Sequence, residues 1–174
     1  MNKPNLKEYL IKTSESRNFT LLEEHLELGH LLYPNWFSFK AEIILTDSST
    51  YQIGPVGFWG TTIELKKDEE VLLNFKMDWN GHIILKTFFD GIESDFVFKN
   101  KGFFKRNYIL QDQFNKELLI IQQDYKWDKM KYDYQLSADY IFANPIHNHI
   151  LYLTCIHCAN YFTSMGTAGA TASF

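Results

Sequence analysis

Clustered positive charge is scarce in this sequence. Its 174 residues include 17 Lys or Arg against 21 Asp or Glu, which gives a net charge of −4, and no long basic stripe appears. A protein that binds nucleic acid through its phosphates needs concentrated cationic side chains. The composition therefore argues against a nucleic-acid-binding protein.

Recognisable catalytic and targeting motifs are also missing. The sequence has no Gly-x-Ser-x-Gly elbow, no phosphate-binding glycine loop and no His-Glu-x-x-His pair. The first residues carry Lys3, Lys7 and Glu8 but no apolar core of a signal peptide. We therefore expect a non-enzymatic protein that needs no cofactor.

Cysteine is limited to Cys155 and Cys158. Two cysteines three residues apart on a helix do not readily form a strain-free disulfide. A chain with this cysteine content is typical of a reducing compartment, so the expected location is cytoplasmic.

The stretch from Ile146 to Met165 is a long run whose apolar residues do not alternate. Asn144 and Pro145 before it are a favoured N-cap and a favoured first helical residue. At about 100° per residue the apolar side chains cover most of the circumference, which is typical of a buried helix. The pattern predicts a helix at about 145–165.

A membrane-spanning helix is the alternative for this stretch. It requires roughly 20 consecutive apolar residues, and polar groups inside hydrocarbon are costly. Five polar residues interrupt the run, and neither Lys nor Arg flanks it: they are His147, Asn148, His149, His157 and Asn160. The sequence therefore favours a helix buried in a protein core and no transmembrane span.

Most of the remaining chain alternates apolar and polar residues, which predicts strands with one buried face. In the first clear strand Phe37, Phe39 and Ala41 alternate with polar residues. Asn80-Gly81 and Asp90-Gly91 are strong hairpin signals. The aromatic content of 17% also favours strands over helices.

Two segments at the N-terminal side are less regular. Residues 1–18 are polar, and we expect a loosely packed segment outside the domain formed by residues 19–174. Residues 19–33 fit either a helix, from the spacing of Leu22, Leu26 and His30, or a hairpin with a tight turn at residues 23–25. Gly29 weakens the helix and favours the hairpin.

The strands are best closed into a barrel, because closure removes unpaired sheet edges. A weak repeat supports closure: Gly57-Phe58-Trp59 and Gly102-Phe103-Phe104 each open a two-strand unit, about 45 residues apart. Eight strands already enclose a filled interior, so about ten leave space for one helix. The predicted fold is mainly β: a closed antiparallel barrel of about ten to twelve strands around one buried C-terminal apolar helix.

This arrangement resembles the tubby C-terminal-like superfold of tubby, LURP-one-related and phospholipid scramblase proteins. The resemblance is carried by Gly57-Phe58-Trp59-Gly60, Lys101-Gly102-Phe103-Phe104, the strand-turn unit of residues 108–120 and the terminal helix, and it covers about Phe19 to Met165. It implies a roughly twelve-stranded barrel around a central helix. Tubby proteins bind phosphoinositide headgroups through a Lys and Arg cluster, whereas this sequence has no equally basic cluster. The calcium-binding and cysteine-rich segments of scramblases are absent as well.

Three groups of residues are candidates for a functional site. Lys99, Lys101, Lys105 and Arg106 surround a glycine turn and could meet an anionic headgroup, or they are solvated turn positions. Asp78-Trp79-Asn80-Gly81 combines an acid with an aromatic residue, as in clefts that bind sugars or peptides. The alternative is a turn that Asp78 caps beside a Trp79 that closes the barrel end.

The third group consists of His147, His149, Cys155 and Cys158, whose side chains are of the types that bind zinc. On a helix, however, these four residues do not converge without ligands from elsewhere, and free cysteine is among the most buried residue types. Core packing is therefore the alternative to a metal or redox site.

The sequence thus leads to three hypotheses about function. The first is a non-enzymatic binding or membrane-peripheral module that recognises an anionic lipid headgroup or a protein partner. The second is a metal-binding or redox protein that uses the Cys and His residues of the C-terminal helix. The third is a purely structural or interaction domain.

Overall fold

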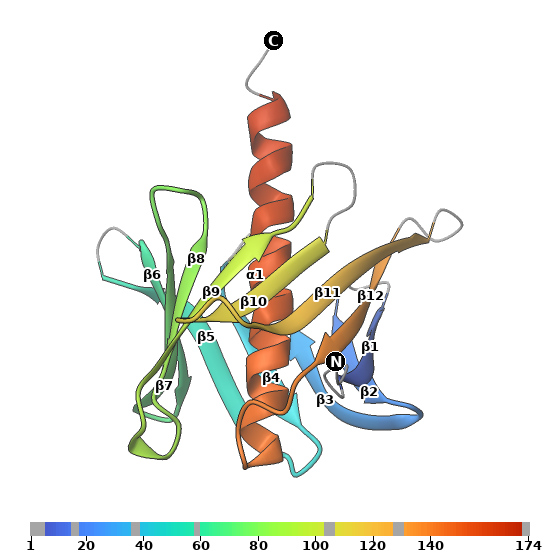
Figure 1. Cartoon of the computed structure of the whole chain (residues 1–174), viewed down its shortest axis with the longest axis vertical. Helices are drawn as coiled ribbons and strands as arrows, with labels where there is room; N and C mark the ends of the chain where they lie inside the picture. The colour runs from blue at the N-terminus through green and yellow to red at the C-terminus, as the bar shows by residue number, and fades with distance from the viewer. Residues whose placement is uncertain are drawn as a thin grey trace.

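A computed structural model describes residues 6–14, 18–35, 39–57, 60–102, 107–126 and 131–171. Twelve antiparallel strands form a closed barrel in which every strand pairs with its neighbours in the chain and β12 pairs with β1 (Figure 1). The predicted closed barrel around one helix is confirmed. The strands are β1 (Lys7–Thr13), β2 (Phe19–Glu23), β3 (Leu26–Leu32), β4 (Ala41–Leu45), β5 (Thr50–Val56), β6 (Thr62–Lys67), β7 (Glu70–Met77), β8 (Ile83–Thr87), β9 (Ser94–Asn100), β10 (Asn107–Asp112), β11 (Glu117–Lys126) and β12 (Lys131–Ala138).

The helix α1 (Pro145–Thr171) runs through the barrel and leaves it at the opposite end (Figure 1). We call the end where β12 passes into α1 the entry end. The other end, where β1–β2, β3–β4, β5–β6, β7–β8, β9–β10 and β11–β12 are connected, is the exit end. α1 has 27 residues and is longer than the helix predicted at about 145–165. The small residues after Met165 continue the helix instead of ending it.

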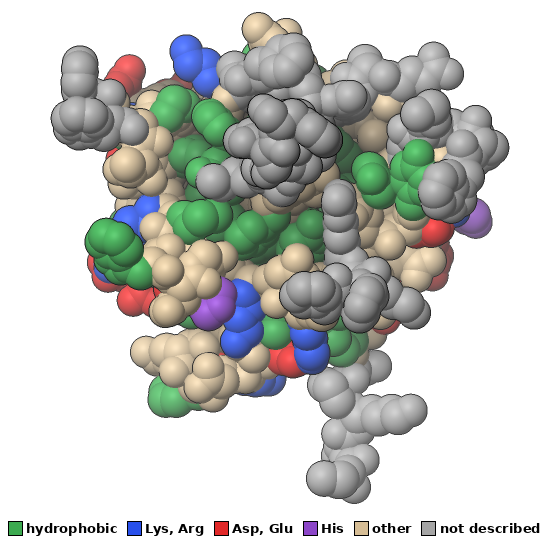
Figure 2. All heavy atoms as spheres, turned by 90° about the horizontal axis from the view of Figure 1, so that it is seen from above, with side chains coloured by type: hydrophobic (Ala, Val, Ile, Leu, Met, Phe, Trp, Pro, Cys, Tyr) green, Lys and Arg blue, Asp and Glu red, His purple; other side chains and the backbone are tan. Residues whose placement is uncertain are grey.

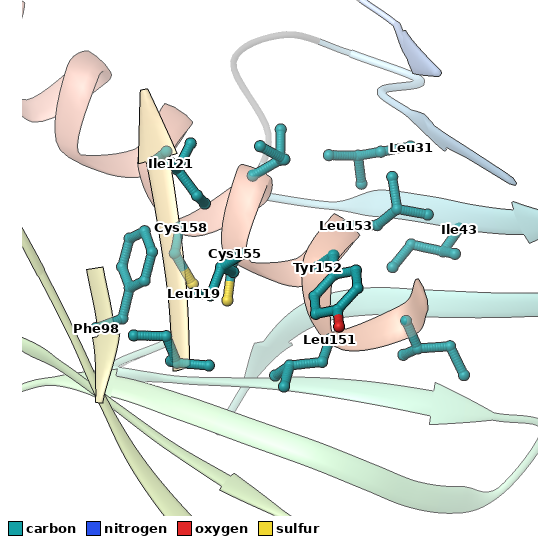
Figure 3. Close-up of a cluster of buried hydrophobic side chains, with 14 of the residues drawn as sticks. Leu31, Ile43, Phe98, Leu119, Ile121, Leu151, Tyr152, Leu153, Cys155 and Cys158 are labelled. Carbon is teal, nitrogen blue, oxygen red and sulfur yellow. The ribbon is translucent and has the colours of Figure 1, made fainter. Parts of the chain in front are cut away.

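Within the barrel α1 is buried on all sides. Residues 150–159 are at most 3% exposed, and they include Leu151, Leu153 and Cys155. Figure 3 shows these side chains among Leu31, Ile43 and Leu119 of the surrounding strands. A helix that is apolar around its circumference thus occupies the interior that a twelve-stranded barrel encloses. A ligand would therefore have to bind outside this filled core.

Polar contacts fix the helix where it enters the barrel. The Oδ1 atom of Asn144 accepts a hydrogen bond from the backbone N–H of Ile146 at 3.0 Å, as expected of an N-cap. The buried Asn148 accepts from the N–H groups of Ile141 and Phe142 at 3.1 and 2.9 Å. These bonds hold the chain segment that precedes the helix against its first turns.

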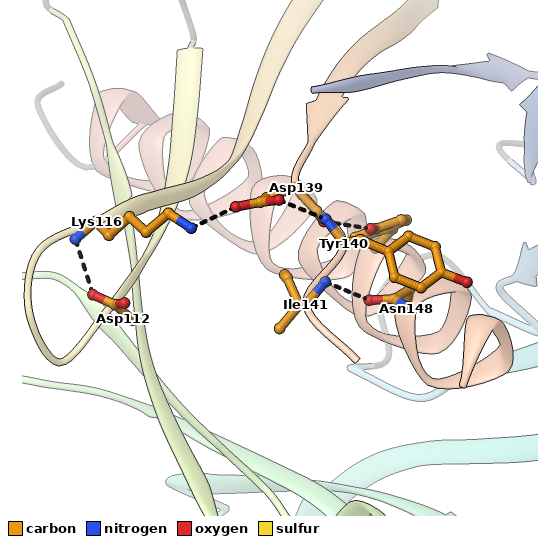
Figure 4. A network of polar contacts seen from close by, with 7 residues as sticks. Asp112, Lys116, Asp139, Tyr140, Ile141 and Asn148 are labelled. Carbon is orange, nitrogen blue, oxygen red and sulfur yellow. Dashed lines mark hydrogen bonds and ion pairs between the residues drawn. The ribbon is translucent and has the colours of Figure 1, made fainter. Parts of the chain in front are cut away.

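A second set of contacts ties this segment to the strands (Figure 4). Asp139 accepts a hydrogen bond from Lys116 Nζ at 2.6 Å and one from the N–H of Tyr140 at 2.9 Å. The backbone carbonyl of Asp139 also accepts from the hydroxyl of Tyr152 at 3.0 Å. Hydrogen bonds from Lys116 on one side and from Tyr152 of α1 on the other therefore hold the segment between β12 and α1 in place.

The N-terminal segment differs from the expectation. Instead of lying loosely outside the domain, residues 7–13 form β1, which pairs with both β12 and β2. Tyr9 and Ile11 of this strand are buried. Without β1 the barrel would not close, so the domain begins before residue 19.

Residues 19–33 form the hairpin β2–β3 and not the alternative helix. Its turn lies at Glu24 and His25, and Glu24 adopts a positive φ of 54°. Gly29 lies where β3 approaches β4 closely, because a Cβ atom added there would come within 2.7 Å of Leu45 Cδ2 and 3.1 Å of the carbonyl oxygen of Ile44. A side chain at this position would therefore displace Leu45 and press on the backbone of β4.

Candidate binding surface

A buried polar cluster lies where α1 approaches the exit end. The hydroxyl of Tyr33 is 2.7 Å from Nδ1 of His157 and accepts a hydrogen bond from Asn160 Nδ2 at 3.1 Å. The hydroxyl of Tyr134 donates to Asn160 Oδ1 at 2.8 Å. Tyr33 and His157 also stack, with ring centroids 5.5 Å apart. The cluster joins α1 to both β12 and the β3–β4 connection, which fixes the depth of the helix in the barrel.

Burial determines the protonation of this cluster. It lowers the pKa of His157 to about 4 and raises the pKa values of Tyr33 and Tyr134 well above the usual range. The imidazole and both phenols are consequently neutral near pH 7. The cluster positions α1 through hydrogen bonds between neutral groups, with no charge in the core.

Exposed apolar side chains lie at the exit end. Phe39 is 47% exposed, Val56 is 39% exposed and Trp79 is fully exposed, and they come from three different connections or strand ends. The ring of Phe39 lies 5.2 Å from that of Tyr161 on α1. Figure 2 views this end and shows hydrophobic side chains gathered around the centre of the face. We refer to Phe39, Val56, Trp79 and Tyr161 as the exit surface.

Trp79 sits at the tip of a well-defined turn between β7 and β8. Oδ1 of Asp78 accepts hydrogen bonds from the N–H groups of Asn80 at 2.8 Å and His82 at 2.9 Å. These bonds lower the pKa of the Asp78 carboxyl, and Gly81 supplies the positive φ of 74° that the turn requires. The predicted capping role of Asp78 is confirmed. Trp79, however, does not close the barrel end, because its indole is fully exposed.

The predicted basic group lies partly at the same end. Lys99 is half-buried on β9, and Lys101 follows that strand. Lys101 Nζ forms an ion pair with Glu117 at 2.5 Å. Lys105 and Arg106 lie outside the described residues. The structure thus brings Lys99 and Lys101 to the exit end, with one of the two charges balanced by a carboxylate.

The two ends of the barrel differ in charge when the connections are compared along the sequence. Among the described residues, the connections of the exit end contain Lys40 and Lys101 against Asp78. Those of the entry end, including the segment from β12 to α1, contain one Lys and seven Asp or Glu. The entry end is therefore acidic, whereas the described connections of the exit end combine the exposed Trp79 with two lysines.

The proposed metal group does not assemble. His147 stacks on Phe89 with ring centroids 4.4 Å apart, near the entry end. His149 is half-buried two residues further along α1, and burial lowers its pKa. Cys155 lies eight residues beyond His147, which corresponds to about 12 Å of helical rise. Within the part of the chain that is described, no group of three or more His, Cys, Asp or Glu could hold a metal ion.

Cys155 and Cys158 are fully buried among the apolar side chains of the barrel (Figure 3). Burial raises the pKa of both thiols above the usual range. A protonated, inaccessible thiol is a poor nucleophile and a poor metal ligand. The environment of both cysteines matches the core-packing interpretation.

The chain has no significant match among protein-family models, curated proteins or solved structures. Among the helical residues that are described, none form a helix both long and apolar enough to cross a membrane.

The sequence pattern named Trp79 as part of a candidate site but gave no indication of Phe39. Phe39 was expected on the buried face of a strand, but β4 begins at Ala41 and Phe39 precedes it. Of the two interpretations of Trp79, closure of the barrel end is wrong because the indole is fully exposed.

Proposed function

We propose that this protein is a non-enzymatic, membrane-peripheral binding module whose exit end contacts an anionic lipid surface. The observation that carries the proposal is the combination, at one end of the barrel, of exposed apolar side chains with Lys40, Lys99 and Lys101, while the connections at the opposite end are acidic. The filled interior also supports binding at the outer surface, because a ligand must be bound outside the core.

The physical chemistry of the exit end suits a membrane interface. Trp and Tyr partition to the boundary between headgroups and hydrocarbon, because their rings are apolar with one polar group. Each Lys or Arg close to an anionic membrane contributes about 1 kcal/mol of attraction, and this attraction weakens as salt is added. Modest apolar insertion together with several cations gives reversible binding without a spanning helix.

The tubby C-terminal-like superfold, which the sequence resembles, includes tubby proteins that bind phosphoinositide headgroups, but through a Lys and Arg cluster that has no equally basic counterpart in this sequence. Within this proposal the anionic surface is the cytoplasmic face of a membrane. That face carries the negative potential that attracts basic segments.

Co-sedimentation with vesicles of phosphatidylcholine and phosphatidylserine tests the proposal. We expect the protein to sediment with these vesicles at low salt and to be released as the salt concentration rises. Trp79→Ser should reduce the bound fraction by about tenfold, because a fully exposed indole is lost from the contact. The matched control is Phe114→Ser, which removes an 80% exposed aromatic residue from the entry end and should leave binding unchanged.

Both substitutions affect exposed side chains, so both variants should melt like the wild type. No sedimentation with vesicles at low salt would refute the proposed function. Equal losses in the two variants would refute the assignment of binding to the exit end.

A further inference from the structure

A site that selects one phosphorylated headgroup needs several cationic donors that converge on the same phosphate. At the exit end the described lysines are dispersed instead. Lys12 lies on β1, Lys40 precedes β4, Lys76 lies on β7 and Lys126 ends β11. Lys99 lies on β9, and Lys101 directly follows that strand. No two of these elements are adjacent in the barrel, since at least one strand separates each from the next. Their charges are spread around the circumference.

Two of the exit-end lysines are also engaged with carboxylates. Lys101 pairs with Glu117 at 2.5 Å, and Lys126 pairs with Asp124. A phosphate that approached either lysine would have to displace a carboxylate or share the cation with it. Such a pair adds little to the recognition of one headgroup, although the protein as a whole still presents positive charge on this end.

The apolar part of the surface is better organised than the cationic part. The Trp79 indole is presented by a turn with four hydrogen bonds: the two that Asp78 Oδ1 accepts, one from Asp78 N–H to the carbonyl of His82 at 2.8 Å, and one from Gly81 N–H to the carbonyl of Asp78 at 3.2 Å. The backbone that carries the indole is therefore held in one conformation and needs no ordering when it enters an interface. Phe39 is likewise supported by Tyr161 of the buried helix.

We infer that the exit surface recognises the lipid interface itself, namely its negative charge density and its accessible hydrocarbon, and not a particular headgroup. The inference rests on the proposed function and specifies its ligand class. Affinity should then follow the surface charge of the vesicle and the presence of Trp79. It should not depend on which anionic lipid supplies the charge.

The test compares two kinds of vesicles prepared with equal surface charge. One contains phosphatidylserine in phosphatidylcholine, and the other contains phosphatidylinositol bisphosphate in phosphatidylcholine. We expect apparent Kd values that agree within about twofold, since the bulk surface potential is the same. Soluble inositol trisphosphate should not release the protein from either vesicle.

Variants separate the apolar and the cationic contributions. Trp79→Ser should weaken binding to both vesicles by the same factor. Lys101→Ala should change binding by less than about twofold, because Glu117 already balances that charge. Phe114→Ser at the entry end is the control for the loss of an exposed aromatic residue.

The outcomes are distinguishable. At equal charge, binding that is more than about tenfold tighter to the bisphosphate vesicles would overturn the inference and leave the proposed function standing. Release of the protein by inositol trisphosphate would also overturn the inference and leave the proposed function standing. A large loss of vesicle binding in Lys101→Ala would have the same consequence. Failure to bind either vesicle at low salt would instead refute the proposed function.

Discussion

Leu153 and Leu26 are residues of the same type in opposite environments. Leu153 on α1 is 0% exposed, whereas Leu26 at the start of β3 is 66% exposed. We expect Leu153→Ala to lower the free energy of unfolding by about 2–5 kcal/mol, because burial is lost and a cavity remains. Leu26→Ala should change it by less than about 0.5 kcal/mol. Urea denaturation measures both, and equal losses would contradict enclosure of the helix.

His157 should make the stability of the barrel depend on pH. Its pKa is about 4 in the folded protein and 6.5 in the unfolded chain, because burial disfavours the imidazolium. Between these values the unfolded chain binds more protons, so stability falls as the pH decreases from 6.5 towards 4. At about 1.4 kcal/mol for each pKa unit, the total loss is about 3 kcal/mol.

The contribution of His157 can be separated from that of the acidic residues by comparing variants. Because Gln does not titrate, the free energy of unfolding of His157→Gln should fall less steeply over this pH range than that of the wild type. His25→Gln, at an exposed turn, should retain the wild-type slope. Urea melts at several pH values provide the measurement. Parallel curves for all three proteins would show that His157 is not buried as a neutral group.

Among the secondary-structure elements, hairpins recur at regular intervals along the chain. The hairpins β2–β3, β6–β7 and β10–β11 each contain a register shift, which follows Leu21, Leu65 and Leu110 respectively. Residues with positive φ stand in the three turns, at Glu24, Asp68 and Asn115. The barrel is thus built from three units of four strands. The weak repeat found in the sequence corresponds to the second and third units.

The first four-strand unit was not recognised as part of the repeat, and the reasons are physical. It has no counterpart of the Gly57 and Gly102 openings, and its strand β1 is flanked by polar residues. The apolar residues of β1 gain their burial from β12, as in the register pair of Ile11 with Tyr134, which lie more than 120 residues apart. Such a partner is invisible in a local window. The later strands and the helix were predictable because their patterns are long and periodic.

The candidate site was harder to predict than the fold. Alternation alone does not show where a strand begins, so Phe39 was assigned to the core although β4 starts two residues later. The exposure of Trp79 depends on whether the indole can fold over the mouth of the barrel, through which α1 passes. His147 and Cys155 of α1 are separated by helical geometry itself, which the sequence spacing already indicates.

Removal of α1 tests the element on which the barrel depends. We expect residues 1–144 to be insoluble or to lack a cooperative melt, because the inward side chains of all the strands lose their partner. Residues 145–174 supplied as a separate chain should restore soluble protein if the helix acts by filling the interior. Differential scanning calorimetry of the purified fragment is the measurement. A cooperative transition of residues 1–144 alone would contradict this architecture.

At the scale of the whole molecule, Lys40, Lys99 and Lys101 lie at the exit end of the barrel, and the connections at the entry end are acidic. An anionic membrane attracts these lysines and repels the acidic connections, so charge and apolar surface favour the same orientation. In that orientation α1 points towards the membrane, with its C-terminal end nearest to the lipid. The exposed Phe114 at the entry end then faces the solvent.

Two single-cysteine labels test this orientation. Cys155 and Cys158 are buried with raised thiol pKa values, so a thiol reagent should react with an introduced surface cysteine alone. A solvent-sensitive fluorophore on Trp79→Cys should shift to shorter wavelength on anionic vesicles and become shielded from an aqueous quencher, provided that the added fluorophore replaces the lost indole in the contact. The same fluorophore on Phe114→Cys should keep its emission and remain quenchable. Shielding at both positions, or at Phe114 alone, would show that the barrel does not approach the membrane with its exit end.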